Sequence, residues 1–192
     1  MVGPALTLAS YLMGSISFGL LEASRRGVDL RDVGSGNVGA TNVARALGRE
    51  TGRKVLLLDM LKGLLPAAAA RWAFDLSWPW ITAVGIAAVV GHCFPIWHGF
   101  RGGKGAATSG GVLLGALPPI GAVTLATWVV AKKITRRASV ASLSAATLGA
   151  ALAMLRYSTE WPARLAIGLW VLIVARHASN IGRLLRGEEP PT

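Results

Sequence analysis

Apolar residues dominate this chain in long runs that short polar segments separate. Six runs approach the length of a membrane span: residues 4–21, 55–74, 79–97, 106–131, 138–155 and 161–175. A helix needs about 20 apolar residues to cross a bilayer. None of the runs alternates apolar and polar residues with a period of two, which is the pattern of strands in a membrane barrel. The pattern therefore predicts an all-α, polytopic integral membrane helical bundle.

The fourth run, residues 106–131, has an unusual arrangement of proline and charge. Pro118 and Pro119 interrupt it, and the basic segments RGGKG (101–105) and KKITRR (132–137) flank it. Basic loops remain in the cytoplasm, so a single crossing would place one flank outside. Two half-helices of about 13 residues, each about 20 Å long and too short to cross, would keep both flanks inside. We therefore predict seven helices in one domain of 192 residues, two of them short and re-entrant.

The composition and the charge distribution agree with a membrane protein. Hydrophobic residues make up 53% of the chain and charged residues 15%, whereas soluble domains contain about 25% charged residues. Of the 20 Lys and Arg, 16 fall in the segments 22–54, 101–105, 132–137 and 176–192. This asymmetry predicts an N-terminus outside and a C-terminus in the cytoplasm. Topology and attraction to membrane lipid then explain the net charge of +11, and no nucleic-acid partner is expected.

The chain offers no pattern for a disulfide, a metal site or a cofactor. Cys93 is the only cysteine, and its apolar surroundings indicate a buried side chain. His92 and His98 lie six residues apart, without the neighbouring Cys, Asp or Glu cluster that a metal site needs. We therefore expect neither a metal nor a cofactor. The polar tail, residues 187–192, is expected to be frayed.

The first unusual polar segment is GSGNVGATNVAR, residues 34–45. Its glycines allow a ligand to approach the backbone, and successive N–H groups can form an anion-binding nest. Arg45 adds a planar cation suited to phosphate. GSGNVG also matches the dinucleotide-binding pattern, but that pattern requires a preceding strand, and here a predicted membrane helix precedes it. A flexible linker is the alternative, and the asparagines and the arginine favour an anion site.

Two further polar segments are predicted to lie on the same cytoplasmic side. In RGGKG (101–105), Lys104 precedes a helix that begins near Ala106, where free N–H groups and the helix dipole favour an anion. This is not a phosphate-binding Walker A motif, because glycine follows the lysine where that motif has Ser or Thr. His177 and Asn180 share one helix face at the end of the last run. Taken alone, this pair is also explained by an interfacial helix end.

Two polar residues inside apolar runs are also candidates. Lys62 lies about two turns into the second run, where an ionisable residue is costly and often functional, although its side chain could also reach the membrane surface. Ser142 is deep enough to face a cavity, although serines in spans also bridge helices. A rival function, transport of organic phosphates, would predict an internal repeat and polar residues on both faces. The sequence has neither.

Three segments together resemble the bacterial acyl-phosphate:glycerol-3-phosphate acyltransferases of the PlsY type. They are GSGNVGATNVAR, GHCFPIWHGFRGGKGAAT at 91–108 and RHASNIGRL at 176–184. The resemblance covers essentially the whole chain, although Arg101 stands where the family more often has lysine. It implies transfer of a fatty acyl group from acyl phosphate to the 1-hydroxyl of glycerol 3-phosphate, which gives lysophosphatidic acid and phosphate. It also implies a bacterial inner-membrane enzyme with its active site at the cytoplasmic face.

The resemblance marks Ser35, Arg45, His177 and Asn180 as functional, and Lys104 joins these catalytic candidates through its glycine-rich loop. The residues expected to bind substrate are Gly36, Asn37, Gly39, Ala40, Thr41, Asn42, Lys62, Gly102, Gly103, Thr108 and Ser142. We hypothesise that residues 35–42 hold the acyl phosphate, while Arg45 and Lys104 hold glycerol 3-phosphate. The proton acceptor stays open between His177 and a substrate phosphate oxygen. A covalent acyl-Ser35 intermediate is the third route.

Overall fold

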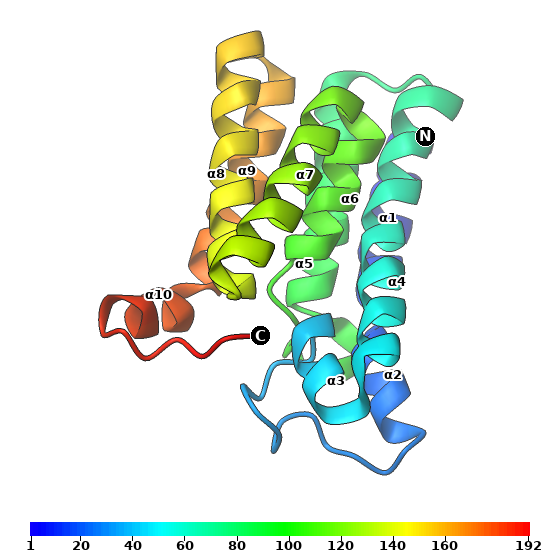
Figure 1. The fold of residues 1–192 in the computed structure, drawn as a ribbon. Helices are drawn as coiled ribbons and strands as arrows, with labels where there is room; N and C mark the ends of the chain where they lie inside the picture. The colour runs from blue at the N-terminus through cyan, green and yellow to red at the C-terminus, as the bar shows by residue number, and fades with distance from the viewer.

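The computed structural model describes all 192 residues and contains helices but no strand (Figure 1). Its helices are α1 Val2–Gly14, α2 Phe18–Ser24, α3 Ala40–Leu47, α4 Arg49–Ala68, α5 Trp78–Cys93, α6 Ala106–Ala116, α7 Pro118–Thr135, α8 Ala138–Tyr157, α9 Trp161–Arg176 and α10 Ala178–Leu185. A π-helical turn, Ala69–Ala73, extends α4, and a 3₁₀ turn, Ile96–His98, follows α5. Each of the six apolar runs contains at least one helix, so the predicted all-α architecture is confirmed.

Three helical segments are long and apolar enough to cross a membrane. They are Val2–Ser24, Trp78–His98 and Ala138–Tyr157. A fourth is reached when α9 and α10, which meet at an angle of 61°, are counted as one span. The first span is broken between α1 and α2, so the backbone carbonyl groups at the break become available to side chains of other helices.

The fourth apolar run divides into α6 and α7 at Leu117. Pro118 and Pro119 form the first turn of α7, where the missing proline N–H costs no helical hydrogen bond. α6 has 11 residues and α7 has 18, which corresponds to about 16 and 27 Å. The prediction of two halves of about 13 residues is therefore wrong in its proportions. The reason is that α7 begins at the prolines themselves and continues through the basic flank to Thr135.

Helices α4 and α6 pack closely through a glycine seam, formed by Gly63, Gly111 and Gly115. A methyl group on Gly63 would overlap the backbone carbonyl of Thr108, and one on Gly111 would overlap the carbonyl of Met60. Small residues at helix interfaces let backbones approach closely in membrane bundles. The glycine seam therefore holds the short helix α6 against the longer α4.

The polar segments gather at one end of the bundle, where α2, α3, α10 and the C-terminal tail lie together in Figure 1. The predicted loop at 34–45 is a loop only as far as Gly39, and α3 follows it. Val43 of α3 is fully buried in a small apolar cluster with Leu30 and Val55. This cluster fixes α3 and the preceding loop on α4, and so gives the polar segment a defined shape.

Candidate active site

One cavity of about 780 Å³ joins the polar end of the bundle to its apolar interior. All five residues predicted to be catalytic line it: Ser35, Arg45, Lys104, His177 and Asn180. Six of the residues predicted to bind substrate also line it: Asn37, Gly39, Ala40, Thr41, Asn42 and Ser142. Farther in, apolar side chains line the wall, among them Leu56, Met60, Leu113, Leu125 and Ile173. The cavity therefore has a charged compartment and an apolar compartment.

The first polar segment enters the cavity as a glycine turn followed by a helix N-terminus. Gly34 has a φ of 58°, and a Cβ there would lie 2.5 Å from Oδ1 of Asn42, so glycine is required on both grounds. α3 begins after Gly39, and the N–H groups of Ala40 and Thr41 have no helical acceptor because they belong to its first turn. These groups and the helix dipole favour an anion in the cavity beside Ser35.

Asn42 holds this turn together through hydrogen bonds to backbone atoms. Its Nδ2 donates to the carbonyl oxygens of Leu30 (3.0 Å) and Val33 (2.9 Å), and its Oδ1 accepts from the N–H of Ser35 (3.1 Å). Both amide hydrogens are thus used within the chain. Asn42 therefore shapes the turn, and its contact with a substrate stays a prediction. Asn42 is only 1% exposed, although it also lines the cavity.

Lys104 reaches the cavity from the loop before α6. Its Nζ donates to Oδ1 of Asn180, which begins the polar face of α10. Burial lowers the pKa of Lys104 to about 8, the nearby positive charges of Arg183, Arg176 and Arg45 act in the same direction, and Glu189 opposes them. The ammonium therefore carries its charge at neutral pH but loses it within the range in which an enzyme can be assayed.

His177 lies at the bend between α9 and α10. Its Nδ1 is 2.8 Å from the carbonyl oxygen of Ile173, so the neutral ring places its hydrogen on Nδ1 and leaves Nε2 as an acceptor. Ser142 of α8 also lines the cavity, and its Oγ accepts from Nε1 of Trp128 at 3.2 Å. The hydrogen of the Ser142 hydroxyl remains available for a ligand.

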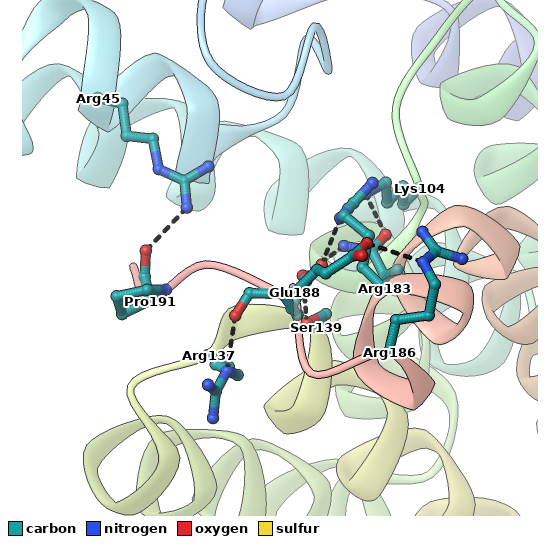
Figure 2. Close-up of polar contacts among 10 residues, drawn as sticks. Arg45, Lys104, Arg137, Ser139, Arg183, Arg186, Glu188 and Pro191 are labelled. Carbon is teal, nitrogen blue, oxygen red and sulfur yellow. Dashed lines mark hydrogen bonds and ion pairs between the residues drawn. The ribbon is translucent and has the colours of Figure 1, made fainter.

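The C-terminal tail, residues 188–192, lies across the polar mouth of the cavity. The carboxylate of Glu189 accepts hydrogen bonds from Ser139 (2.6 Å), Asn180 (2.6 Å) and Arg183 (2.7 Å). Figure 2 shows the tail reaching Arg45, whose Nη2 donates to the carbonyl oxygen of Pro191 at 3.0 Å. The expectation of a frayed tail is therefore wrong, because a buried carboxylate with three donors anchors it.

The family profile of the glycerol-3-phosphate acyltransferases matches residues 4–187 of the chain. The chain belongs to this family. It is 46% identical over 196 residues to the glycerol-3-phosphate acyltransferase of Thioalkalivibrio sulfidiphilus (strain HL-EbGR7), across 99% of this chain and 94% of the relative. The corresponding protein of Aquifex aeolicus (strain VF5) is 44% identical over 188 residues, across 96% of each chain.

Two crystal structures of PlsY (YgiH), an integral membrane glycerol 3-phosphate acyltransferase, have the same fold. The glycerol 3-phosphate form matches with a TM-score of 0.95 and 41% identity, across 100% of this chain and 96% of that one. The lysophosphatidic acid form matches with a TM-score of 0.92 and 40% identity, across 100% and 95% of the two chains. The predicted family is confirmed, and this glycerol-3-phosphate acyltransferase family member is a multi-pass integral membrane enzyme.

Five residues predicted to bind substrate do not line the cavity: Gly36, Lys62, Gly102, Gly103 and Thr108. Thr108 faces α4 across the glycine seam. Lys62 is 3% exposed, and its Nζ lies 3.0 Å from a carboxylate oxygen of Asp59 and 2.8 Å from the carbonyl oxygen of Ile16. The structure thus gives Lys62 an internal ion pair that ties α4 to the break between α1 and α2, and its contact with substrate stays a prediction.

Arg183 and Glu189 also line the cavity, although neither was predicted from the sequence. Arg183 had a readable signal, because it follows Asn180 by three residues and so shares a helix face with it. Glu189 had none, because its partner Ser139 is 50 residues away. Burial alone raises the pKa of Glu189, but the hydrogen bonds from Ser139, Asn180 and Arg183 outweigh it and hold the pKa below its usual value. The carboxylate is therefore ionised at neutral pH.

We expect Glu189→Ala to lower the melting temperature of the detergent-solubilised enzyme by about 6 °C, since about 2 kcal/mol is lost when three donors lose a charged acceptor. Glu188→Ala is the matched control. Glu188 is exposed and pairs only with Arg186, at 2.8 Å, and such surface pairs contribute little. Equal melting temperatures for the two variants would show that the tail is not anchored by Glu189.

Proposed function

We propose that the enzyme transfers a fatty acyl group from acyl phosphate to the 1-hydroxyl of glycerol 3-phosphate, forming lysophosphatidic acid and phosphate. The observation that carries this proposal is the single cavity in which cationic residues and an apolar wall meet. Both substrates carry a phosphate, and one also carries an acyl chain. A site for this reaction must therefore hold two anions beside an apolar compartment for the acyl chain, within one domain.

The phosphates are assigned to two parts of the charged compartment. Arg45 and Lys104 bind the phosphate of glycerol 3-phosphate, because these two cations from different elements line the cavity and lie near enough for the charge of Arg45 to lower the pKa of Lys104. Ser142, His177 and Asn180 orient its hydroxyl groups. The acyl phosphate lies at the N-terminus of α3, where the turn from Gly34 to Gly39 and the first N–H groups of the helix face the cavity.

The chemical step needs alignment more than a protein nucleophile. Acyl phosphate is a mixed anhydride, so the glycerol 1-hydroxyl attacks its carbonyl carbon, the new ester C–O bond forms, and the bond to the phosphate oxygen breaks. Backbone donors and cations stabilise the oxyanion and the leaving phosphate. The proton of the hydroxyl passes to Nε2 of His177 or to a substrate phosphate oxygen. Retained activity and an unchanged pH profile in His177→Gln would identify a substrate phosphate oxygen as the proton acceptor.

The proposed reaction is tested directly with purified enzyme. Acyl phosphate and glycerol 3-phosphate are supplied together, and released phosphate and lysophosphatidic acid are measured in parallel. The two products should appear in equal amounts, and both should require glycerol 3-phosphate. Phosphate release that does not depend on glycerol 3-phosphate would show hydrolysis instead of acyl transfer.

We expect kcat/KM for glycerol 3-phosphate to fall by about tenfold for each pH unit above 8. The sign follows from Lys104, whose pKa of about 8 means that its ammonium is neutralised as the pH rises through that value. The measurement is a pH series from 7 to 9.5, corrected for uncatalysed hydrolysis of acyl phosphate. In Lys104→Arg, the residual activity should lack this fall because arginine stays charged. A wild-type profile that is flat across this range would contradict the assignment.

The enzyme is placed in the bacterial inner membrane with the cavity mouth and the C-terminus in the cytoplasm and the N-terminus outside. The excess of Lys and Arg in the segments at the polar end supports this orientation, and arginine–aromatic pairs mark the opposite end of the bundle as a second membrane–water interface. Arg71 lies 5.0 Å from the ring of Trp72 and 4.4 Å from that of Trp78, and Arg164 lies 5.0 Å from the ring of Trp161. Aromatic belts of this kind mark a membrane–water interface.

A further inference from the structure

The loop that carries Lys104 lies flat on the end of α5. The N–H groups of Gly102 and Gly103 donate to the carbonyl oxygens of Cys93 and His92, both at 3.1 Å. A methyl group on Gly102 would overlap the carbonyl of His92, and one on Gly103 would overlap its imidazole ring. The two glycines are therefore needed for contact with α5, and one side of the loop is fixed there.

Arg176, the last residue of α9, holds the opposite side of the same loop. Its Nε donates to the carbonyl oxygen of Gly103 and its Nη2 to that of Gly102, both at 3.1 Å. The guanidinium also lies 5.1 Å from the ring of Phe94, which favours one orientation of the plane. Two nitrogen atoms thus contact two successive carbonyl groups, a geometry that the single nitrogen of lysine cannot reproduce.

Arg176 does not line the cavity, so its guanidinium is not placed to bind substrate. It is, however, adjacent in sequence to His177 and four residues before Asn180, whose Oδ1 accepts from Nζ of Lys104. The bend between α9 and α10 therefore contacts the Lys104 loop twice. Arg176 holds the backbone of the loop, and Asn180 holds the end of the lysine side chain.

We propose that Arg176 is a positioning residue for Lys104, which it holds at a fixed distance from His177 and Asn180 by fastening the loop backbone to the α9–α10 bend. The proposal rests on the proposed function, in which Lys104 binds the phosphate of glycerol 3-phosphate. Displacement of a substrate-positioning group by about 1 Å can cost about 100-fold in rate. The role of Arg176 is thus to keep the lysine in place without touching the substrate.

The first test is Arg176→Lys, which keeps the charge and removes the two-carbonyl contact. It should lower kcat/KM for glycerol 3-phosphate by about 10- to 100-fold, mainly through KM, and leave KM for acyl phosphate unchanged. Arg164→Lys is the matched control on the same helix, because Arg164 donates to the carbonyl oxygen of Thr159 at 2.7 Å and lies over Trp161. The control should match wild type. If Arg176→Lys also matches wild type, the positioning role is wrong.

The second test is a double-mutant cycle that separates positioning of Lys104 from general support of the fold. In a Lys104→Ala background, Arg176→Lys should have little further effect, because the group it positions is gone. If Arg176→Lys lowers kcat/KM by the same factor in the Lys104→Ala background as in the wild-type enzyme, the proposal is wrong. If Arg176→Lys does not fold, Arg176→Gln, which donates from one nitrogen only, takes its place in both tests.

The cycle also separates the positioning role of Arg176 from the phosphate contact of Lys104. Loss of activity in Lys104→Ala with normal activity in Arg176→Lys would overturn only the positioning role. Normal activity in Lys104→Ala would instead overturn the proposed phosphate contact of Lys104, and with it the inference that depends on it.

Discussion

Lys104→Ala is expected to lower kcat/KM for glycerol 3-phosphate by about a thousand-fold. Removal of one preorganised electrostatic contact costs about 100- to 1,000-fold in comparable sites. Here the loss is at the upper end, because the same substitution leaves Oδ1 of Asn180 without its donor and leaves the cavity with one cation fewer near Arg45. Steady-state phosphate release with glycerol 3-phosphate varied at saturating acyl phosphate measures the effect.

Lys133→Ala is the control for a general loss of positive charge. Lys133 is exposed in the last turn of α7 and does not line the cavity, so its removal changes the net charge by the same amount. It should retain wild-type kinetics. If Lys104→Ala and Lys133→Ala lose activity equally, attraction of anions to the basic surface explains the effect and the specific phosphate contact does not exist.

Gly111→Ala is expected to produce the largest loss of stability. A Cβ at this position would lie 2.9 Å from the backbone nitrogen of Leu64 and closer still to the carbonyl oxygen of Met60, so α4 and α6 must move apart. Overpacking of this kind costs about 3 kcal/mol, or about 10 °C in melting temperature for a chain of this size. Thermal unfolding in detergent measures it.

Gly110 supplies the matched control, one residue away on the same helix. A Cβ on Gly110 meets nothing within 4 Å, and alanine is favoured over glycine in a helix interior by about 0.5–1 kcal/mol. Gly110→Ala should therefore unfold at the same temperature as wild type or slightly higher. Equal destabilisation of both variants would mean that helix propensity decides the outcome and that the glycine seam does not.

Much of the bundle could be predicted because apolar runs and prolines are local signals. The break at Pro118 and the helix in each run follow from residues within a few positions of one another. α3 was missed because its polar sequence becomes helical through the burial of Val43 against Val55, a contact between different elements. The tail was missed for the same reason, since the carboxylate of Glu189 binds partners on α8 and α10.

The candidate site divides along similar lines. The five residues predicted to be catalytic come from the three polar segments and all line one cavity, because topology brings those segments to the same end of the bundle. The task of each glycine could not be read from sequence. Gly34 shapes a turn, whereas Gly102 and Gly103 make room for α5. The ion pair of Lys62 could have been predicted, since Asp59 lies three residues earlier on the same helix face.

Because α6 is short, its insertion into the membrane depends on α4. At 11 residues the helix is about 16 Å long and cannot be held by the bilayer alone. Its retention depends on the glycine seam, so α4 must already be in the membrane when α6 leaves the ribosome and translocation machinery. In chains truncated after α6, a cysteine placed at Val112, which is fully buried and does not line the cavity, should therefore be shielded from water-soluble thiol reagents only when Gly111 is intact. Biogenesis of the enzyme then relies on close contact between the backbones of α4 and α6.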